Sequence, residues 1–245
     1  MILLLTGCIN PNGMVYTSLC NQEERKTQYI NAINFYLSNT KLPIVFVDNS
    51  GTDISNHFQN YINSGRMEYI TYSGNNDKQR GKGFGEAHII EYALENSNII
   101  NSMSHHRIAK ITGRLIIKNL NIVTCIHRIL FSKRTVLCAI NSELSFPDSR
   151  FIIADADFFK AFLKKKGKIN DSTRYYFEHA LCDTIKEDNN FPFSPFLYKP
   201  IIIGVSGSTG EIYKEDTLTI PYIIKYAKFA LSQRHRFNKI YRQNK

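Results

Sequence analysis

The stretch Ile2-Leu-Leu-Leu-Thr6 is an apolar run that ends at Gly7. A continuous apolar run of this length is typical of a strand that is covered on both faces. The polar loop from Gly7 to Gly13 then lies where an α/β sheet presents a loop to a ligand. This opening stretch therefore predicts the first strand of an α/β fold.

Strand and helix patterns alternate after this first strand. Apolar residues recur at helical spacing between Gln22 and Leu37, and a second buried strand, Ile44-Val-Phe-Val47, follows Pro43. The next predicted element is a helix that carries Ile54, Phe58, Tyr61 and Ile62, and Thr52 or Asp53 can cap it. A strand at 67–72, a helix at 81–95 and a strand at 107–112 follow. Residues 1–112 therefore predict a doubly wound parallel sheet.

The second half is less regular. We expect helices at 120–131, 155–166, 171–186 and 221–242, strands at 135–140 and 201–204, and extended chain at 151–153. The sequence contains neither an internal repeat nor a linker pattern. A single domain over residues 1–216 with a C-terminal extension over 217–245 is the predicted organisation.

Composition and charge restrict the class of protein. The chain has 245 residues, 43% of them hydrophobic, and its 31 Lys and Arg against 21 Asp and Glu give a net charge of +10, which favours anionic partners. The five cysteines show no C-x-x-C spacing, so we expect neither disulfides nor zinc, and a reducing, cytoplasmic setting fits best. The apolar run at residues 1–5 is too short for a signal peptide or a membrane span.

Four segments hold the informative polar residues, and three of them fall at the carboxyl ends of predicted strands, the edge where open α/β sheets bind ligands. Asp48 can accept hydrogen bonds from a ribose or a base, or it can form the turn before Asn49. The segment Arg80-Gly-Lys-Gly-Phe-Gly-Glu-Ala87 opens a helix, where N–H groups, the helix dipole and two cations suit an anion. Its spacing matches neither a dinucleotide fingerprint nor a P-loop, and a flexible glycine loop is the alternative.

The segment Lys110-Ile-Thr-Gly-Arg114 ends the strand predicted at 107–112, and its glycine allows a sharp turn. An Arg can neutralise a diphosphate through two parallel hydrogen bonds without a metal. His105 and His106 stand just before this strand. Adjacent strand residues point to opposite faces, so we expect these histidines to be solvated surface rather than metal ligands.

Glu178 lies within Tyr175-Tyr-Phe-Glu-His-Ala180. A carboxylate on an aromatic helix face is desolvated, which raises its proton affinity and suits a general base for an alcohol. A structural pair with Arg174 or His179 is the alternative. Asp155-Ala-Asp157 has the form of a divalent-ion site, but capping of the helix that it begins explains both acids.

The last 29 residues, 217–245, hold seven Lys and Arg and no Asp or Glu, and apolar side chains interleave with the basic ones. The pattern predicts a basic amphipathic helix that can lie on an anionic membrane surface. RNA binding or a merely solubilising tail would also fit it.

Short motifs spread over most of the chain resemble those of bacterial glycosyltransferases with the GT-A fold, in the subgroup that assembles capsules or lipopolysaccharide. These motifs are Thr6-Gly-Cys-Ile-Asn10, Val47-Asp-Asn-Ser50, Gly81-Lys-Gly-Phe-Gly-Glu-Ala87, Lys110-Ile-Thr-Gly-Arg114, Asp148-Ser-Arg150 and Gly204-Val-Ser-Gly-Ser-Thr-Gly210.

The resemblance implies a Rossmann-like, mostly parallel sheet flanked by helices, in which residues 1–112 bind the nucleotide sugar and residues 113–216 bind the acceptor. In most enzymes of this fold a D-x-D follows the fourth strand. Thr112-Gly-Arg114 stands there instead, which makes a divalent metal doubtful and points to Arg114, with Lys110, for stabilising the diphosphate. The implied donor-binding residues are Thr6, Gly7, Asp48, Asn49, Arg80, Gly81, Lys82, Gly83, Gly85, Glu86, Lys110, Thr112, Gly113 and Arg114.

If the reaction inverts the configuration of the sugar, the same resemblance implies that Glu178 is the base, with Asp148 as second choice. The implied acceptor-binding residues are Ser149, Arg150, Ser206 and Ser208. Neither the sugar, the nucleotide, the linkage nor the stereochemistry follows from the sequence.

We therefore expect an enzyme that transfers a sugar from a nucleotide-diphosphate donor to a hydroxyl of a lipid-linked surface glycan. It would act at the inner face of the membrane, without a tightly bound cofactor or a nucleic-acid partner. One alternative is a sugar-nucleotide pyrophosphorylase, although the loop from Gly7 to Gly13 lacks the Lys or Arg expected there. The other is a non-catalytic basic adaptor for RNA or anionic lipid.

Overall fold

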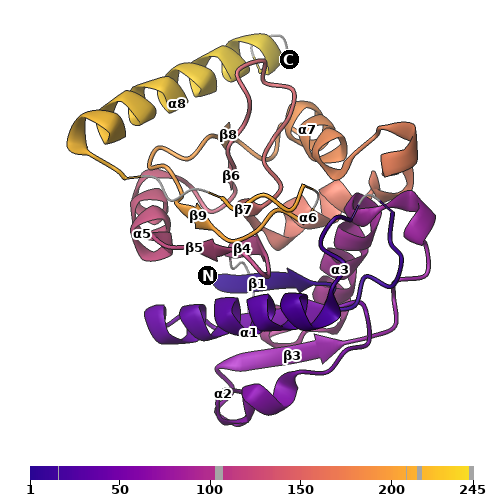
Figure 1. The fold of residues 1–245 in the computed structure, drawn as a ribbon. Helices are drawn as coiled ribbons and strands as arrows, with labels where there is room; N and C mark the ends of the chain where they lie inside the picture. The colour runs from indigo at the N-terminus through magenta and orange to yellow at the C-terminus, as the bar shows by residue number, and fades with distance from the viewer. Residues whose placement is uncertain (16, 103–106, 208, 214–216, 243–245) are drawn as a thin grey trace.

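The computed structural model describes residues 1–15, 17–102, 107–207, 209–213 and 217–242 (Figure 1). A seven-stranded sheet in the order β3-β2-β1-β4-β7-β6-β8 forms its centre. Pairing is parallel from β3 to β4, and β7 runs antiparallel to both of its neighbours. The strands are β1 (Ile2–Gly7), β2 (Ile44–Asp48), β3 (Met67–Thr71), β4 (Arg107–Thr112), β6 (Val136–Leu137), β7 (Phe151–Asp155) and β8 (Phe193–Ser194), and β5 (Ile116–Ile117) pairs with β9 (Ile202–Ile203) beside the sheet.

Helices cover both faces of this sheet. In β1, Leu3 and Leu5 face one hydrophobic cluster, whereas Ile2 and Leu4 face the other. The first cluster is closed by α1 (Gln22–Asn39) and α5 (Leu120–Leu130), and the second by α3 (Lys82–Asn96), α6 (Ala156–Leu163) and α7 (Phe177–Glu187). The expected α/β class, with a mostly parallel sheet flanked by helices, is confirmed.

The strand order brings several chain segments to one edge of the sheet. Because β1 lies between β2 and β4, the chain reverses its direction of winding beside β1, at a topological switch point. Gly7 pairs with Asp48, and Thr6 pairs with Thr112, so these strand ends lie side by side. Phe151 at the start of antiparallel β7 pairs with Ile111, which brings the preceding loop to the same edge.

Two predicted helices are broken into shorter pieces. The helix expected after Asp53 is instead a 3-10 turn, Ser55–His57, followed by α2 (Gln59–Asn63). Phe58 between them has a non-helical φ of −128°, and its ring is buried in the core. The helix expected from Asp171 begins only at Phe177, because Arg174 adopts a left-handed φ of 61° and ends the turn Asp171–Thr173. Glu178 therefore lies in the first turn of α7.

Other boundaries differ less from the prediction. The strand expected at 135–140 is limited to β6, and Ile140 makes only an isolated bridge with Pro147. Asp155 caps α6 as predicted, because its carboxylate accepts a hydrogen bond from the Phe158 amide at 2.8 Å. The remaining helices are α4 (Asn98–Asn101), the 3-10 turns Lys78–Arg80 and Lys166–Lys168, and α8 (Ile220–Tyr241).

The C-terminal helix α8 packs along the β8 edge of the sheet (Figure 1). Ala230, Gln233 and Phe237 form its buried side, and the Phe237 ring lies 4.7 Å from that of Phe193. The Gln233 amide donates to the carbonyl oxygens of Ile140 and Asn141. Within the described ranges, no helix has both the length and the apolar character needed to cross a membrane.

Candidate functional site

A cleft of about 1240 Å³ opens where β1, β2 and β4 end. Its walls come from the loops after these strands, the first turns of α3, the loop before β7, the start of α7 and the loop around residue 206. The predicted site residues that line it are Thr6, Gly7, Asn49, Lys82, Gly83, Gly85, Glu86, Thr112, Arg114, Asp148, Ser149, Arg150, Glu178 and Ser206. Residues from both halves of the sequence thus share one cavity.

Five other predicted site residues do not line this cleft: Asp48, Arg80, Gly81, Lys110 and Gly113. Gly113 joins two strand ends, because its amide donates to the Thr6 carbonyl oxygen at 2.8 Å. Ser208, His105 and His106 lie outside the described residues.

Asp48 uses its carboxylate to hold two loops together. Its oxygens accept hydrogen bonds from the Ile9 amide at 2.7 Å and from the amide and hydroxyl of Ser50 at 2.8 and 2.7 Å. The side chain is fully buried. Asp48 therefore fixes the loop after β1 against the loop after β2. This role resembles the predicted alternative, in which Asp48 forms the turn before Asn49.

The N-terminus of α3 receives a carboxylate of the protein itself. The Gly83 amide donates to Asp171 at 3.3 Å. Gly81 has a φ of 85°, and a Cβ there would come within 2.2 Å of the Asp171 carboxylate, so only glycine fits. Arg80 turns away from the cleft and donates to the carbonyl oxygens of Gly167 and Ile169.

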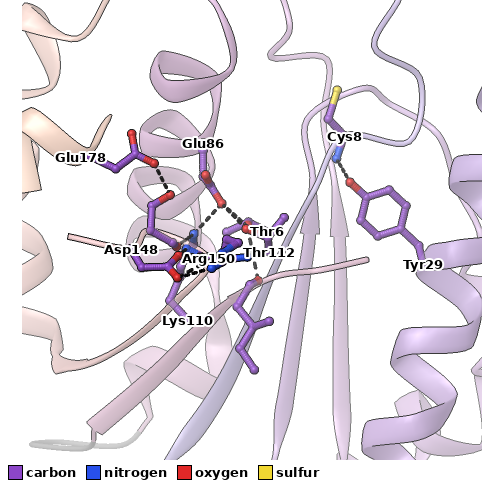
Figure 2. A network of polar contacts seen from close by, with 11 residues as sticks. Thr6, Cys8, Tyr29, Glu86, Lys110, Thr112, Asp148, Arg150 and Glu178 are labelled. Carbon is purple, nitrogen blue, oxygen red and sulfur yellow. Dashed lines mark hydrogen bonds and ion pairs between the residues drawn. The ribbon is translucent and has the colours of Figure 1, made fainter. Parts of the chain in front are cut away.

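An ion pair between a buried lysine and a half-buried glutamate lies at the floor of the cleft (Figure 2). The Lys110 ammonium is fully buried, 2.5 Å from the Glu86 carboxylate, and also donates to the Ser149 carbonyl oxygen at 2.6 Å. The hydroxyl groups of Thr6 and Thr112 donate to the same Glu86 oxygen at 2.8 and 3.2 Å. This network joins α3 to the ends of β1 and β4 and compensates the charge of each partner.

Glu178 reaches the same network from α7. The Ser149 hydroxyl donates to the Glu178 carboxylate at 2.5 Å. Burial raises the pKa of Glu178 and the nearby Glu86 charge adds to the rise, whereas Ser149 and Lys110 act in the opposite direction. A carboxyl group with raised proton affinity that faces a cleft is suited to general acid–base chemistry.

Asp148 is engaged by its neighbour Arg150. The guanidinium group holds the carboxylate through two contacts, Nε to Oδ1 at 2.9 Å and Nη2 to Oδ2 at 2.5 Å. This pair raises the pKa of Arg150, and the guanidinium lies 4.6 Å from the centre of the Tyr213 ring. Asp148 is thus a weaker candidate for a base than Glu178.

Three cations from separate elements gather in the cleft: Arg25 of α1, Lys82 of α3 and Arg114 after β4. Burial lowers the pKa of Lys82, and the Arg114 and Arg25 charges lower it further, although Asp171 raises it. Burial likewise lowers the pKa of Arg114, with a further contribution from Arg25. The cations therefore repel one another, and an anionic ligand would relieve this repulsion.

Each arginine of this group is held in place by backbone carbonyl groups. Arg25 donates to the Cys8 carbonyl oxygen at 2.9 and 2.5 Å. Arg114 donates to the Val205 carbonyl oxygen at 2.6 Å. Gly207 lies so close to Arg114 that a Cβ there would approach its guanidinium within 2.3 Å. The glycine-rich loop thus positions a cation and approaches it closely.

Asn49 lines the cleft with a side chain that is only 1% exposed. Neither its amide nitrogen nor its amide oxygen has a hydrogen-bond partner among the described residues. A buried amide without partners costs about 1–3 kcal/mol. A ligand with both a donor and an acceptor would satisfy it.

Sequence reasoning missed several residues of the cleft, among them Arg25, Tyr29, Asp171 and Tyr213. A signal for Arg25 was present, because the helix that follows β1 begins at the ligand-binding edge of the sheet. The described residues contain no group of three or more His, Cys, Asp or Glu side chains placed to hold a metal.

Comparisons with known proteins give no evidence on function, so the geometry of the cleft is the basis for the proposal below. No protein-family model matches the sequence, and no curated protein matches it significantly.

Proposed function

We propose that the protein is a glycosyltransferase that moves a sugar from a nucleotide-diphosphate donor to a hydroxyl group. The observation that carries the proposal is the group of Arg25, Lys82 and Arg114 at the switch point of the sheet. Open α/β sheets bind nucleotides at such points. A diphosphate supplies the compensating negative charge, and as a leaving group it needs positive charge as the sugar departs.

The unpaired Asn49 amide supports a nucleotide as the ligand. It lies at the end of β2, next to the strand end of β1. Bases and riboses carry donors and acceptors together, as the amide requires. The sheet, with its parallel half and a single opposed strand among those described, is compatible with the GT-A fold that the sequence motifs resemble.

The residues after β4 do not fit a divalent cation. Arg114 stands where a carboxylate of a D-x-D would be expected. The neighbouring carboxylate, Glu86, is already engaged by Lys110 and two threonine hydroxyl groups. We therefore assign the stabilisation of the leaving diphosphate to the three cations and derive no step through a metal.

Glu178 is the proposed base for an inverting transfer. Its carboxylate would take the proton of the acceptor hydroxyl as that oxygen bonds to the anomeric carbon. The bond from this carbon to the diphosphate oxygen breaks, and its electron pair leaves with the nucleoside diphosphate. The raised proton affinity of Glu178 suits this role.

The two alternatives have less support. A pyrophosphorylase would need phosphate-binding cations in the loop after β1, and residues 8–15 contain neither Lys nor Arg. A basic adaptor does not account for Glu86 and Glu178 inside the cleft. The glycosyltransferase proposal accounts for both the cations and the carboxylates.

Thermal stabilisation by a panel of uridine, guanosine, cytidine and thymidine diphosphate sugars tests the proposal. Each would be measured with a divalent ion and with a chelator. A selective donor at about 100 times its Kd adds roughly 2.7 kcal/mol to the free energy of unfolding. A selective shift that survives chelation supports the proposal, and a uniformly flat panel in both conditions would overturn it.

A further inference from the structure

Helix α8 exposes an apolar row on the side that does not pack on the sheet. Ile220, Ile224 and Leu231 are 74%, 51% and 47% exposed. Their spacing of four and seven residues places them along one side of the helix. Three exposed aliphatic side chains in a row on a helix indicate a surface that binds a partner.

Basic residues flank this row. Lys225, Lys228 and Lys239 are exposed, and residues 217–242 contain neither Asp nor Glu. A basic helix with exposed aliphatic residues combines the two attractions that hold a protein on an anionic bilayer.

Helix α5 extends the apolar surface. Its Ile122, Ile129 and Leu130 are 49%, 74% and 56% exposed. The Arg234 guanidinium lies 5.1 Å from the centre of the Phe131 ring, directly after α5. Because Leu231 and Arg234 are three residues apart on α8, they project from the same side of the helix. This contact brings the end of α5 next to α8, and in Figure 1 α5 lies at the left while α8 runs across the top.

We propose that this region binds the surface of an anionic phospholipid bilayer. The docking face is formed by Ile122, Ile129 and Leu130 of α5 and by Ile220, Ile224, Lys225, Lys228, Leu231 and Lys239 of α8. Its aliphatic side chains would enter the boundary between headgroups and acyl chains, and its lysines would pair with lipid phosphates.

Charge and side-chain type favour lipid over other occupants. Two copies joined through this face would bring two sets of lysines together, which is unfavourable. RNA binding of this kind relies on stacking aromatic side chains. The most exposed apolar residues of the docking face are isoleucines, and these suit acyl chains instead.

Docking would also orient the cleft. The Gln233 amide of α8 donates to the carbonyl oxygen of Ile140, and Ile140 forms a bridge with Pro147, so the middle of α8 lies near the loop before β7. An acceptor linked to a lipid would then enter the cleft from the membrane side. This last step rests on the proposed function, but the docking itself does not.

Co-sedimentation of the full chain with vesicles tests the docking. Vesicles of phosphatidylcholine alone would be compared with vesicles that also contain phosphatidylglycerol, without any nucleotide sugar. We expect salt-sensitive binding to the anionic vesicles only. Lys225→Glu/Lys228→Glu should weaken it by about thirty-fold or more, since each Lys near the surface contributes about 1 kcal/mol. Ile224→Glu/Leu231→Glu should abolish it.

Matched controls are Lys41→Glu and Tyr61→Glu, which alter exposed residues near the β3 edge, at the other end of the sheet. Both should bind like the unchanged protein. Equal binding by the docking-face variants, or no binding by the unchanged protein, would overturn the proposal. So would a dimer in light scattering that Ile224→Glu/Leu231→Glu dissociates, or RNA binding with no vesicle binding.

The same series of variants distinguishes loss of docking from loss of folding, and docking from the proposed function. The altered side chains are exposed, so thermal melting should match that of the unchanged protein. If the glutamate variants melt early, Lys225→Ala/Lys228→Ala provides the decisive comparison. Loss of vesicle binding with intact donor stabilisation implicates the docking face alone, whereas vesicle binding with a flat donor panel contradicts only the proposed function.

Discussion

Asp48 and Asn49 are adjacent in the chain, yet their buried side chains have opposite surroundings. The Asp48 carboxylate accepts hydrogen bonds from Ile9 and Ser50, whereas the Asn49 amide has no partner among the described residues. The first side chain is satisfied by the fold. The second is not, and the proposed function gives it a nucleotide as its partner, so substitution at the two positions should have different consequences.

Asn49→Ala should not lower the free energy of unfolding without ligand, and should raise it by up to about 3 kcal/mol. The substitution removes a buried group that gains nothing from the folded state. Donor binding should weaken by about ten-fold, because one hydrogen-bonded pair is worth roughly that much. Chemical denaturation and titration with the donor measure the two effects, and an equal loss in both would contradict the assignment.

Asp48→Ala should show the reverse pattern. Removal of the carboxylate leaves the buried Ile9 amide and the half-buried Ser50 amide without this acceptor, and a buried orphaned donor costs about 1–3 kcal/mol. A large loss of stability is expected in the absence of any ligand. A variant as stable as the unchanged protein, but defective in donor binding, would return Asp48 to the direct donor contact that its position in the sequence suggested.

Arg114→Lys tests the proposed role of the cationic group, and Arg107→Lys is its matched control. Both arginines are buried, both donate to backbone carbonyl groups, and burial lowers the pKa of each. Arg107 begins β4, at the end of the sheet away from the cleft. Both variants should lose stability, but only Arg114→Lys should also weaken donor binding. Equal donor affinity in isothermal titration of the two variants would contradict the assignment.

Glu178→Gln should reduce transfer by about 10²- to 10⁴-fold if Glu178 is the base, with donor binding unchanged. Because burial raises the pKa of Glu178 in the folded state, its contribution to stability is present below the ordinary pKa and is lost as pH rises through the raised value. Activity needs the carboxylate and should rise over that same interval. Glu178→Gln should therefore be at least as stable as the unchanged protein at neutral pH, and thermal melts across pH measure the difference.

The parts of the fold that were predictable from sequence are those with local causes. Ile2–Gly7 and Ile44–Asp48 are apolar runs of strand length, and their ends fixed the edge where the cleft opens. The breaks at Phe58 and Arg174 depend on tertiary packing and on backbone strain, which the apolar spacing does not report. These breaks changed helix lengths but not the strand order.

The residues of the site were predictable where they follow strand ends, but their partners were not. Most of the predicted site residues line the cleft, because several of their motifs follow strand ends. The motifs could not reveal that Asp171 caps a helix at Gly83, since 88 residues separate the two. Nor could they show that Lys110 is buried against Glu86 rather than facing a ligand. Partners of this kind are set by the fold as a whole.

The pair of Lys110 and Glu86 offers a prediction that joins stability to chemistry. Lys110→Met removes the buried cation and leaves the Glu86 carboxylate without its compensating charge. Breaking one side of a buried pair costs about 3–5 kcal/mol, whereas replacing both partners costs less. Glu86→Gln/Lys110→Met should thus be more stable than Lys110→Met alone, and a double-mutant cycle from denaturant unfolding measures the coupling.

The same pair should also shift the pH profile. The Lys110 charge lowers the pKa of Glu178 and the Glu86 charge raises it. Lys110→Met should therefore move the rise of transfer activity to higher pH, and the added Glu86→Gln should move it back. A merely structural network would change the height of the profile and leave its midpoint in place, so the midpoint decides whether this buried pair tunes the proposed base.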